Sequence, residues 1–139
     1  MGSVDVFHTV RDLRAWREAQ RQLGHSVGLV ATMGALHAGH LQLVRAAAAA
    51  CSAVVVSIFV NPAQFAPHED LATYPRSLEQ DIAQLSREHA PCVVFAPSVS
   101  EMYPRGITTT RALQQGTFVE VLGLSEMLEG GSRPHFFRG

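Results

Sequence analysis

The chain has 139 residues, of which 47% are hydrophobic, and a formal net charge of −1 at pH 7. These values fit one domain with an apolar core, and the balanced charge without a basic patch argues against a nucleic-acid partner. No apolar run is long enough to cross a membrane, and the first residues lack the basic-then-apolar pattern of a secretion signal. Cys51 and Cys92 lie far apart among apolar neighbours, which is typical of free thiols in a reducing cytoplasm.

The first two thirds of the chain alternate between helix and strand patterns. Apolar residues at helical spacing predict a helix over residues 9–23, with Thr9 as its N-cap and Gly24 as its stop. Strand, helix, strand, helix and strand patterns follow, over residues 27–31, 40–50, 53–60, 77–85 and 93–96. This alternation predicts an α/β fold with a doubly wound parallel sheet and right-handed crossovers.

The pattern changes after Tyr103 and Pro104. Residues 107–111 and 117–121 are rich in β-branched side chains and flank a Gln-Gln-Gly sequence, which predicts a β-hairpin near 107–121. Residues 122–129 predict a short helix or turn, broken by Gly130 and Gly131.

The sequence Thr-Met-Gly-Ala-Leu-His-Ala-Gly-His, residues 32–40, follows the first apolar strand pattern. Its glycines let the backbone approach a ligand, and a helix that begins here directs N–H groups and a positive dipole end at an anion. His37 and His40 would lie on one face of the first turn, where they could bind triphosphate oxygens. The same residues also fit surface histidines or, less well, a metal pair, and Gly34 and Gly39 could simply form turns.

Two amide side chains follow the second predicted strand. Asn61 and Gln64 come after residues 53–60, and the carboxyl ends of neighbouring parallel strands meet at one edge of a sheet. We therefore expect them near the histidine loop, where an amide could bind a ligand that carries hydroxyl and carboxylate groups. Alternatively, Asn61 caps a turn before Pro62.

Five blocks of the sequence resemble the pantothenate synthetase (pantoate–β-alanine ligase) family, whose members belong to the HxGH nucleotidyltransferases. The blocks keep the family's order and extend over nearly the whole chain after residue 27. They read TMGALHAGH (32–40), VVVSIFVNPAQF (54–65), EDLATYPRSLEQD (69–81), VFAPSVSEMYP (94–104) and EGGSRPHFFRG (129–139).

The resemblance implies a Rossmann-like fold of the nucleotidyltransferase type, with residues 1–139 as an amino-terminal nucleotide-binding domain that the family extends with a second domain. It implies an ATP-dependent ligase that joins (R)-pantoate to β-alanine through a pantoyl-adenylate intermediate, giving pantothenate for coenzyme A synthesis. ATP is the co-substrate and Mg²⁺ the implied metal. A cytoplasmic homodimer with small-molecule substrates, and without membrane or nucleic-acid partners, is the implied setting.

The resemblance also assigns roles by position. His40 and His37 would be catalytic, contacting phosphates, with His40 as the family's proposed proton donor. Gln64 and Asn61 would bind pantoate or lie beside β-alanine, and Asp81 is a weaker transfer as a residue near the nucleotide or magnesium. The ATP loop would comprise Met33, Gly34, Ala35, Leu36, His37, Ala38, Gly39 and His40.

The sequence departs from the family pattern in ways that matter for activity. Ala31 stands where the family usually has proline. The family's glycine-x-lysine-aspartate and methionine-serine-serine-arginine blocks are absent, and the chain contains no lysine. We therefore expect little ligase activity from this chain alone. Two alternatives stay open. One is another HxGH adenylyltransferase, acting on a phosphate ester. The other is a truncated non-catalytic piece that binds nucleotide weakly or pairs with a full-length partner through its sheet or hairpin, because a three-stranded parallel sheet would leave an exposed apolar edge.

Overall fold

The computed structural model describes residues 4–65, 77–88, 90–108, 110–133 and 136–137. The chain divides into two compact units. The first unit comprises residues 1–60 and 75–102, and the second comprises residues 61–74 and 103–139. Each unit is described by itself.

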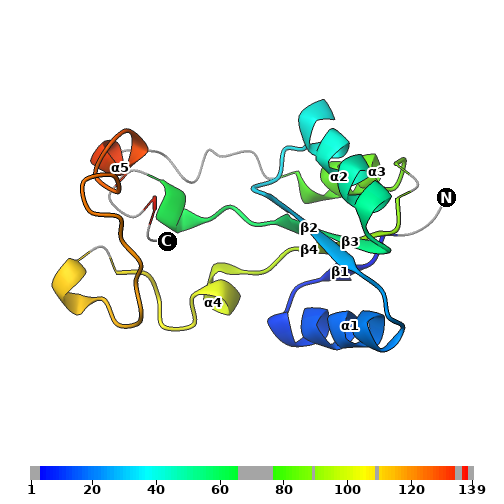
Figure 1. Ribbon diagram of the computed structural model, residues 1–139, viewed down its shortest axis with the longest axis horizontal. Coiled ribbons are helices and arrows are strands. Elements are labelled where there is room, and N and C mark those ends of the chain that lie inside the picture. Colours follow the sequence, from blue (N-terminus) through cyan, green and yellow to red (C-terminus); the bar gives the residue numbers. More distant parts are fainter. Residues whose placement is uncertain (1–3, 66–76, 89, 109, 134–135, 138–139) are drawn as a thin grey trace. The chain divides into compact units, whose positions relative to one another are not determined.

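The first unit is a parallel four-stranded sheet with helices on both faces (Figure 1). Its strands lie in the order β1-β4-β3-β2. α1 covers one face of this sheet, and α2 and α3 cover the other. The strands are β1 (Val6–Phe7), β2 (Val27–Thr32), β3 (Ala53–Ile58) and β4 (Cys92–Phe95), and the helices are α1 (Val10–Gln22), α2 (Ala38–Ala50), α3 (Leu78–Leu85) and the short α4 (Val99–Met102). The predicted doubly wound fold is confirmed.

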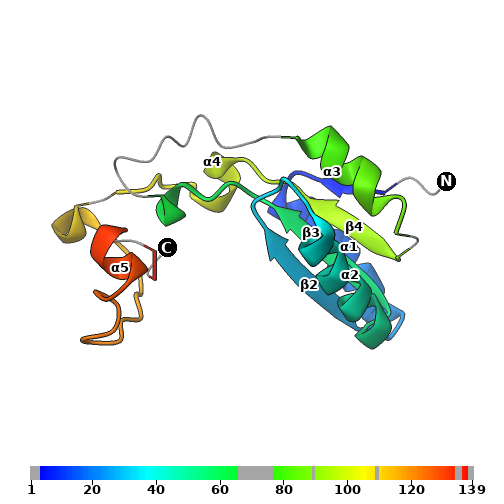
Figure 2. The same ribbon diagram turned by 90° about the horizontal axis from the view of Figure 1, so that it is seen from above.

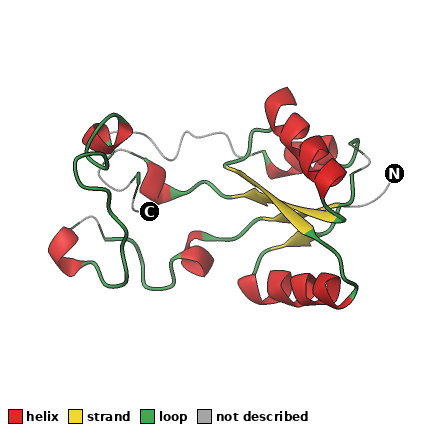
Figure 3. Ribbon diagram, in the orientation of Figure 1, coloured by secondary structure: helices red, strands yellow, loops and turns green. Residues whose placement is uncertain are grey.

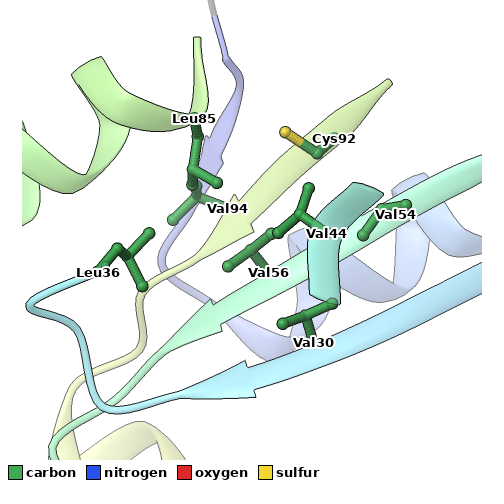
Figure 4. Close-up of a cluster of buried hydrophobic side chains, with 8 residues drawn as sticks. All are labelled: Val30, Leu36, Val44, Val54, Val56, Leu85, Cys92 and Val94. Atoms are coloured by element: carbon green, nitrogen blue, oxygen red, sulfur yellow. The ribbon is translucent and has the colours of Figure 1, made fainter. Parts of the chain in front are cut away.

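Alternation of side chains along the strands builds two cores. Val54, Val56 and Val94 are fully buried toward α2 and α3, together with Val44 and Leu85. Figure 4 shows this cluster. The intervening Val55, Val93 and Phe95 face α1, where Leu13 and Trp16 pack against them. Since successive strand residues point to opposite faces, these nearly continuous apolar runs are typical of strands covered on both sides.

The boundaries of the predicted elements differ from the structure by one or two residues. Thr9 caps α1 as predicted, accepting a hydrogen bond from the Asp12 N–H, and Gly24 follows the helix with a φ of 73°. α2 begins at Ala38 rather than at residue 40, because His37 serves as its N-cap. β3 ends at Ile58, two residues earlier than predicted.

The sheet has one strand that the sequence patterns did not predict. β1 is only two residues long, and it pairs with β4 through Val6–Val94 and Phe7–Phe95. A three-stranded sheet was therefore wrong, since β1 covers the outer edge of β4. The open edge belongs to β2, where the Leu29 side chain is 68% exposed (Figure 2).

The second unit contains short helical turns in its described part (Figure 3). They are two 3-10 helices, Pro62–Gln64 and Arg111–Leu113, and α5 (Glu129–Ser132). The predicted hairpin near 107–121 is wrong, because the described residues of this range form no strand. Val119 and Val121 are exposed, so the β-branched residues lack the packing against neighbouring strands that stabilises a sheet.

Gly130 and Gly131 lie inside α5 and do not break a helix as predicted. A Cβ atom at residue 130 would collide with the Ser125 carbonyl oxygen. Glycine therefore permits the close backbone packing of this turn. Among the described residues, no helix is long and apolar enough to span a bilayer.

Candidate functional site

The site is built on the loop of residues 33–37, which joins the end of β2 to the start of α2. The loop turns through two left-handed residues, Gly34 with a φ of 88° and Ala35 with a φ of 51°. The buried Thr32 fixes its start: the hydroxyl accepts the Gly34 N–H at 3.1 Å and donates to the Ser57 carbonyl on β3 at 2.9 Å. The loop therefore leaves the sheet in a defined direction.

Helix α3 holds the same loop from the other side. The Asp81 side chain, only 1% exposed, accepts the Ala35 N–H through Oδ2 at 3.0 Å and the Leu36 N–H through Oδ1 at 2.8 Å. Gln84 donates from Nε2 to the Leu36 carbonyl at 3.2 Å. A Cβ at residue 34 would lie 3.1 Å from Asp81 Oδ2, so glycine suits this position by space as well as by φ.

Backbone hydrogen bonds orient both histidines. The Gly39 N–H donates to His37 Nδ1 at 3.1 Å, and the His37 N–H donates to His40 Nδ1 at 3.3 Å. An imidazole nitrogen that accepts an N–H carries no proton itself, so the neutral rings carry theirs on Nε2. The two rings lie 4.0 Å apart between centroids. The start of α2 thus presents two neighbouring Nε2–H donors.

Gly39 makes room for this arrangement. A Cβ atom at residue 39 would lie 2.9 Å from His37 Cε1 and 3.1 Å from His37 Nδ1, closer than ordinary carbon contacts allow. The His-x-Gly-His spacing therefore has a steric basis. The His37 imidazole lies over residue 39, where only glycine leaves room for it, and His40 follows at the next position.

Most amides of the loop are already engaged within the protein. The N–H groups of residues 34, 35, 36, 37 and 39 all donate to the side chains described above. The sequence predicts that the backbone of this loop binds phosphate, but these five N–H groups are occupied by acceptors within the protein. The His40 N–H also donates to the His37 side chain, in a capping box at the start of α2. In the described part of the chain, the Ala38 amide has no protein acceptor, as is usual for the first turn of a helix.

The charge state of His40 fits an N–H donor. Partial burial lowers the pKa of His40, the neighbouring His37 lowers that pKa further, and the Asp81 carboxylate acts in the opposite direction. The neutral imidazole, with its proton on Nε2, is therefore the form that the folded chain favours near neutral pH.

A pocket of about 590 Å³ opens beside the loop, at the carboxyl ends of the strands. Met33, Gly34 and Asp81 line it, together with Ile58 at the end of β3 and Ser98 after β4. Ligands of open parallel sheets bind at this edge. The predicted ATP-loop residues differ in exposure: Leu36 packs its side chain into the core (Figure 4), whereas His37, Ala38 and Gly39 are exposed.

Asn61 and Gln64 belong to the second unit, so their predicted nearness to the histidine loop stays a prediction. Asn61 does cap the 3-10 turn, as in the alternative interpretation: its Oδ1 accepts the Ala63 N–H at 3.1 Å. The same oxygen accepts the Tyr103 hydroxyl at 2.8 Å. Because both of these groups donate to Oδ1, the N–H groups of Asn61 Nδ2 can bind other partners.

No metal centre is seen among the residues that the structure describes, which contain no cluster of three or more His, Cys, Asp or Glu side chains suited to a metal ion. The two Asp81 oxygens already accept backbone N–H groups. The magnesium role expected for Asp81 therefore stays a prediction. Tyr74, Pro75 and Arg76, which also match the family pattern, lie outside the described residues.

Three side chains that make structural contacts at the candidate site residues were not predicted from the sequence. Thr32 lies within the motif, where the sequence indicates only the end of a strand, and Tyr103 lies in a matching block without an assigned role. Gln84 lies three residues after Asp81, a spacing that puts both on one helix face. That spacing was the available signal for Gln84.

Comparison with known proteins gives a consistent result. A family model described as pantoate-beta-alanine ligase matches residues 5–139. The chain is 55% identical over 140 residues to pantothenate synthetase of Acidobacterium capsulatum and 53% identical over 134 residues to that of Koribacter versatilis. These matches cover 97% and 96% of this chain but 44% and 43% of the relatives, so the chain spans less than half of their length.

Solved structures agree. The structure of pantoate-beta-alanine ligase from Francisella tularensis complexed with beta-gamma ATP and beta-alanine is similar with a TM-score of 0.81 at 35% identity, covering 98% of this chain and 49% of that one. Pantothenate synthetase from Thermus thermophilus gives 0.76 at 43% identity, covering 97% and 44%. With the family model matching almost every residue, the chain belongs to the pantoate-beta-alanine ligase family.

Proposed function

We propose that this chain supplies the nucleotide-binding part of an enzyme that joins (R)-pantoate to β-alanine, converting ATP to AMP and pyrophosphate and forming pantothenate. Family membership over residues 5–139 supports the reaction class. The similar Francisella protein was solved with an ATP compound and β-alanine, which supports these two substrates. The observation that carries the proposal is the pair of imidazoles whose Nδ1 atoms are both engaged by backbone N–H groups.

In the first step, a pantoate carboxylate oxygen attacks the α-phosphorus of ATP. The P–O bond to the β-phosphate breaks, and pyrophosphate leaves. The Nε2–H groups of His37 and His40 would donate to phosphate oxygens, where negative charge grows as pyrophosphate departs. Because Asp81, Thr32 and Gln84 hold the loop before ATP arrives, these donors need little reorganisation.

In the second step, the β-alanine amine attacks the carbonyl carbon of pantoyl adenylate. The bond from that carbon to the AMP oxygen breaks, AMP leaves, and the amine loses a proton. Gln64 and Asn61 are the proposed contacts for the acid and its hydroxyl groups, and the Nδ2 donors of Asn61 suit carboxylate or hydroxyl oxygens.

Magnesium enters this proposal as a partner of the ATP phosphates. Mg²⁺ commonly binds substrate phosphates and several waters with few protein ligands, and it would neutralise phosphate charge. Because both Asp81 oxygens accept backbone N–H groups, we derive no step from a protein-held ion at this residue.

A chimera tests the proposed function. In it, this chain replaces the aligned part of the Acidobacterium relative, to which it is 55% identical over 140 residues. We expect the chimera to form pantothenate and AMP from pantoate, β-alanine and ATP. A His40→Ala chimera should be impaired by about 100-fold or more in kcat, as for loss of a donor to a developing anion.

The matched control is Gln42→Ala, an exposed residue of the same helix two positions beyond His40. Equal activity of the His40→Ala and control chimeras would contradict the catalytic assignment. Transfer of AMP to a phosphate ester, without pantothenate formation, would favour a different adenylyltransferase.

We further propose a cytoplasmic homodimer that acts on small molecules, without nucleic-acid or membrane partners. Free thiols at Cys51 and Cys92 fit a reducing compartment, and the dimer rests on family resemblance. Sedimentation of the purified chain would test the dimer, and a monomer at all concentrations would contradict it for this piece.

A further inference from the structure

We propose that Asp81 is a positioning residue that acts as a clamp, holding the phosphate-binding loop through the backbone rather than contacting the nucleotide or a metal. The proposal rests on the proposed function for the identity of the ligand. The observation itself is independent of that ligand: a buried carboxylate on α3 accepts two consecutive amides of a loop 45 residues away in the chain.

The geometry is that of a structural anchor. Oδ1 and Oδ2 each take one N–H, at 2.8 and 3.0 Å, and the side chain is only 1% exposed. Such charge-assisted bonds are among the stronger hydrogen bonds in proteins. Asp81 lines the pocket beside the loop together with Gly34 and Met33, but both of its oxygens accept backbone N–H groups.

The clamp explains why a strained loop is stable here. Ala35 has a φ of 51°, a conformation that is costly for a residue with a side chain. Its N–H is the one that Asp81 Oδ2 accepts, and the next N–H belongs to Leu36, whose side chain is buried in the core. Asp81 therefore offsets the cost of the turn and sets where α2 begins.

The clamp also reaches the histidines through the chain. Leu36 is the residue before His37, and Gln84, one helical turn after Asp81, donates to the Leu36 carbonyl. Both polar groups of the Leu36 backbone are thus held by α3. The position of the His37 N–H, which fixes the His40 ring, follows from this attachment.

Asp81→Asn is the direct test, because asparagine keeps the size of the side chain. Its single carbonyl oxygen can accept a hydrogen bond from one of the two backbone N–H groups. Its NH₂ group is itself a donor, so it cannot accept from the other N–H group. We expect hydrogen exchange of the Ala35 or Leu36 amide to accelerate by about tenfold or more, which corresponds to the loss of one hydrogen bond to a charged group. ATP binding to the 139-residue chain should weaken by about tenfold.

Magnesium separates the clamp from a metal ligand. If Asp81 is a clamp, the Asp81→Asn variant should bind ATP more weakly than the unmodified chain by the same factor in Mg²⁺ and in EDTA. A metal ligand predicts a loss only when Mg²⁺ is present, and that result would overturn the proposal. The matched control is Glu79→Gln, which removes an exposed carboxylate from the first turn of the same helix and should change neither amide exchange nor ATP affinity.

Two further measurements keep the test decisive. If Asp81→Asn does not fold, as judged by the methyl signals of Val56 and Val94, Gly34→Ala takes its place, since its Cβ would press on Asp81 Oδ2. It should accelerate exchange of the Ala35 amide, whose acceptor is that oxygen. Unchanged exchange in the folded variant would refute the clamp. If the unmodified chain fails to bind ATP, the proposed function fails for this piece, while amide exchange still decides the clamp.

Discussion

At the scale of single residues, the site depends on which atom of each imidazole the backbone occupies. The Gly39 and His37 amides both donate to Nδ1 atoms, and this leaves the Nε2–H groups for a ligand. The two histidines are surface-accessible side chains with fixed orientation, because the contacts that orient them belong to the backbone of the helix start. A substitution that disturbs this backbone should therefore act like a change in the histidines.

Gly39→Ala should displace the His37 ring, because the new Cβ would lie 2.9 Å from Cε1. We expect ATP binding to weaken, measured by calorimetry, although alanine favours helix by about 1 kcal/mol relative to glycine. The control, Ala49→Gly, lowers helix propensity at an exposed position of α2 and should leave ATP affinity unchanged. Unaltered affinity in Gly39→Ala would show that the ring position does not matter.

The lowered pKa of His40 gives a pH dependence with a defined sign. Its folded-state pKa lies below the unfolded value of about 6.5, so the unfolded chain binds the proton more tightly. The stabilising contribution is present above pH 6.5 and is lost as the pH falls through the folded pKa. Carbon-detected NMR titration of the His40 ring, in the folded chain and in urea, measures both values.

His37→Ala removes the second cause of the lowered pKa, so it should raise the folded-state pKa of His40. The contribution of burial remains in that variant and limits the rise. A His40 pKa that is equal in folded and urea-unfolded chain would contradict this account of the site.

At the scale of elements, α3 matters because it carries Asp81 and Gln84. It is anchored by Leu85, which is 1% exposed and packs in the cluster with Val44, Val56 and Val94. α2 lies close to β2, where a Cβ at residue 28 would be 3.2 Å from the Ala47 Cβ. The alanine run of α2 therefore serves close helix–strand packing as well as helix propensity.

Leu85→Ala should lower the free energy of unfolding by about 3 kcal/mol, from lost apolar burial and the cavity left behind. Urea denaturation of the 139-residue chain measures this value. The matched control is Leu43→Ala on α2, where the side chain is 55% exposed, and we expect a cost below about 1 kcal/mol. Equal costs for the two variants would mean that α3 is not anchored by Leu85.

The sequence predicted those elements whose signal is local and repeated. Apolar runs of four or more residues identified β2, β3 and β4, and Thr9 with Gly24 bounded α1. β1 was missed because two residues carry no periodicity, and only its pairing with β4 makes it a strand. The hairpin at 107–121 was predicted wrongly from composition alone, since β-branched residues form strands only where a partner packs against them.

The sequence predicts only the part of the site that lies in one contiguous motif. Residues 32–40 identified the loop and both histidines, but the contacts that hold the loop come from Ser57, Asp81 and Gln84 on other elements. The family resemblance places Asp81 near the nucleotide or magnesium. Its burial and its two amide partners depend on how α3 packs, and no local pattern encodes that.

At the scale of the whole molecule, the chain forms two compact units and spans less than half the length of its similar relatives. The first unit holds the histidine loop, and the second holds Asn61 and Gln64. The sequence contains no lysine, so arginine, histidine and the helix N-terminus are the protein groups that could bring positive charge to the phosphates. We therefore expect this piece to retain weak nucleotide binding without turnover.

The 139-residue chain alone should bind ATP weakly and show little or no ligase activity. Release of AMP in the presence of pantoate and β-alanine, followed by coupled assay, measures turnover, and His40→Ala provides the background rate. We expect the two rates to be equal within error. Substantial turnover by the chain that is lost in His40→Ala would show that these residues suffice for catalysis.

We propose that residues 32–40 present two prearranged Nε2–H donors to a triphosphate. The most direct measurement is long-range ¹H–¹⁵N NMR of the His37 and His40 rings during titration with a non-hydrolysable ATP analogue. We expect Nε2–H tautomers for both rings in the free chain and changes in both Nε2 signals on binding. Nδ1–H tautomers in the free chain, or unchanged ring signals under saturating analogue, would contradict it.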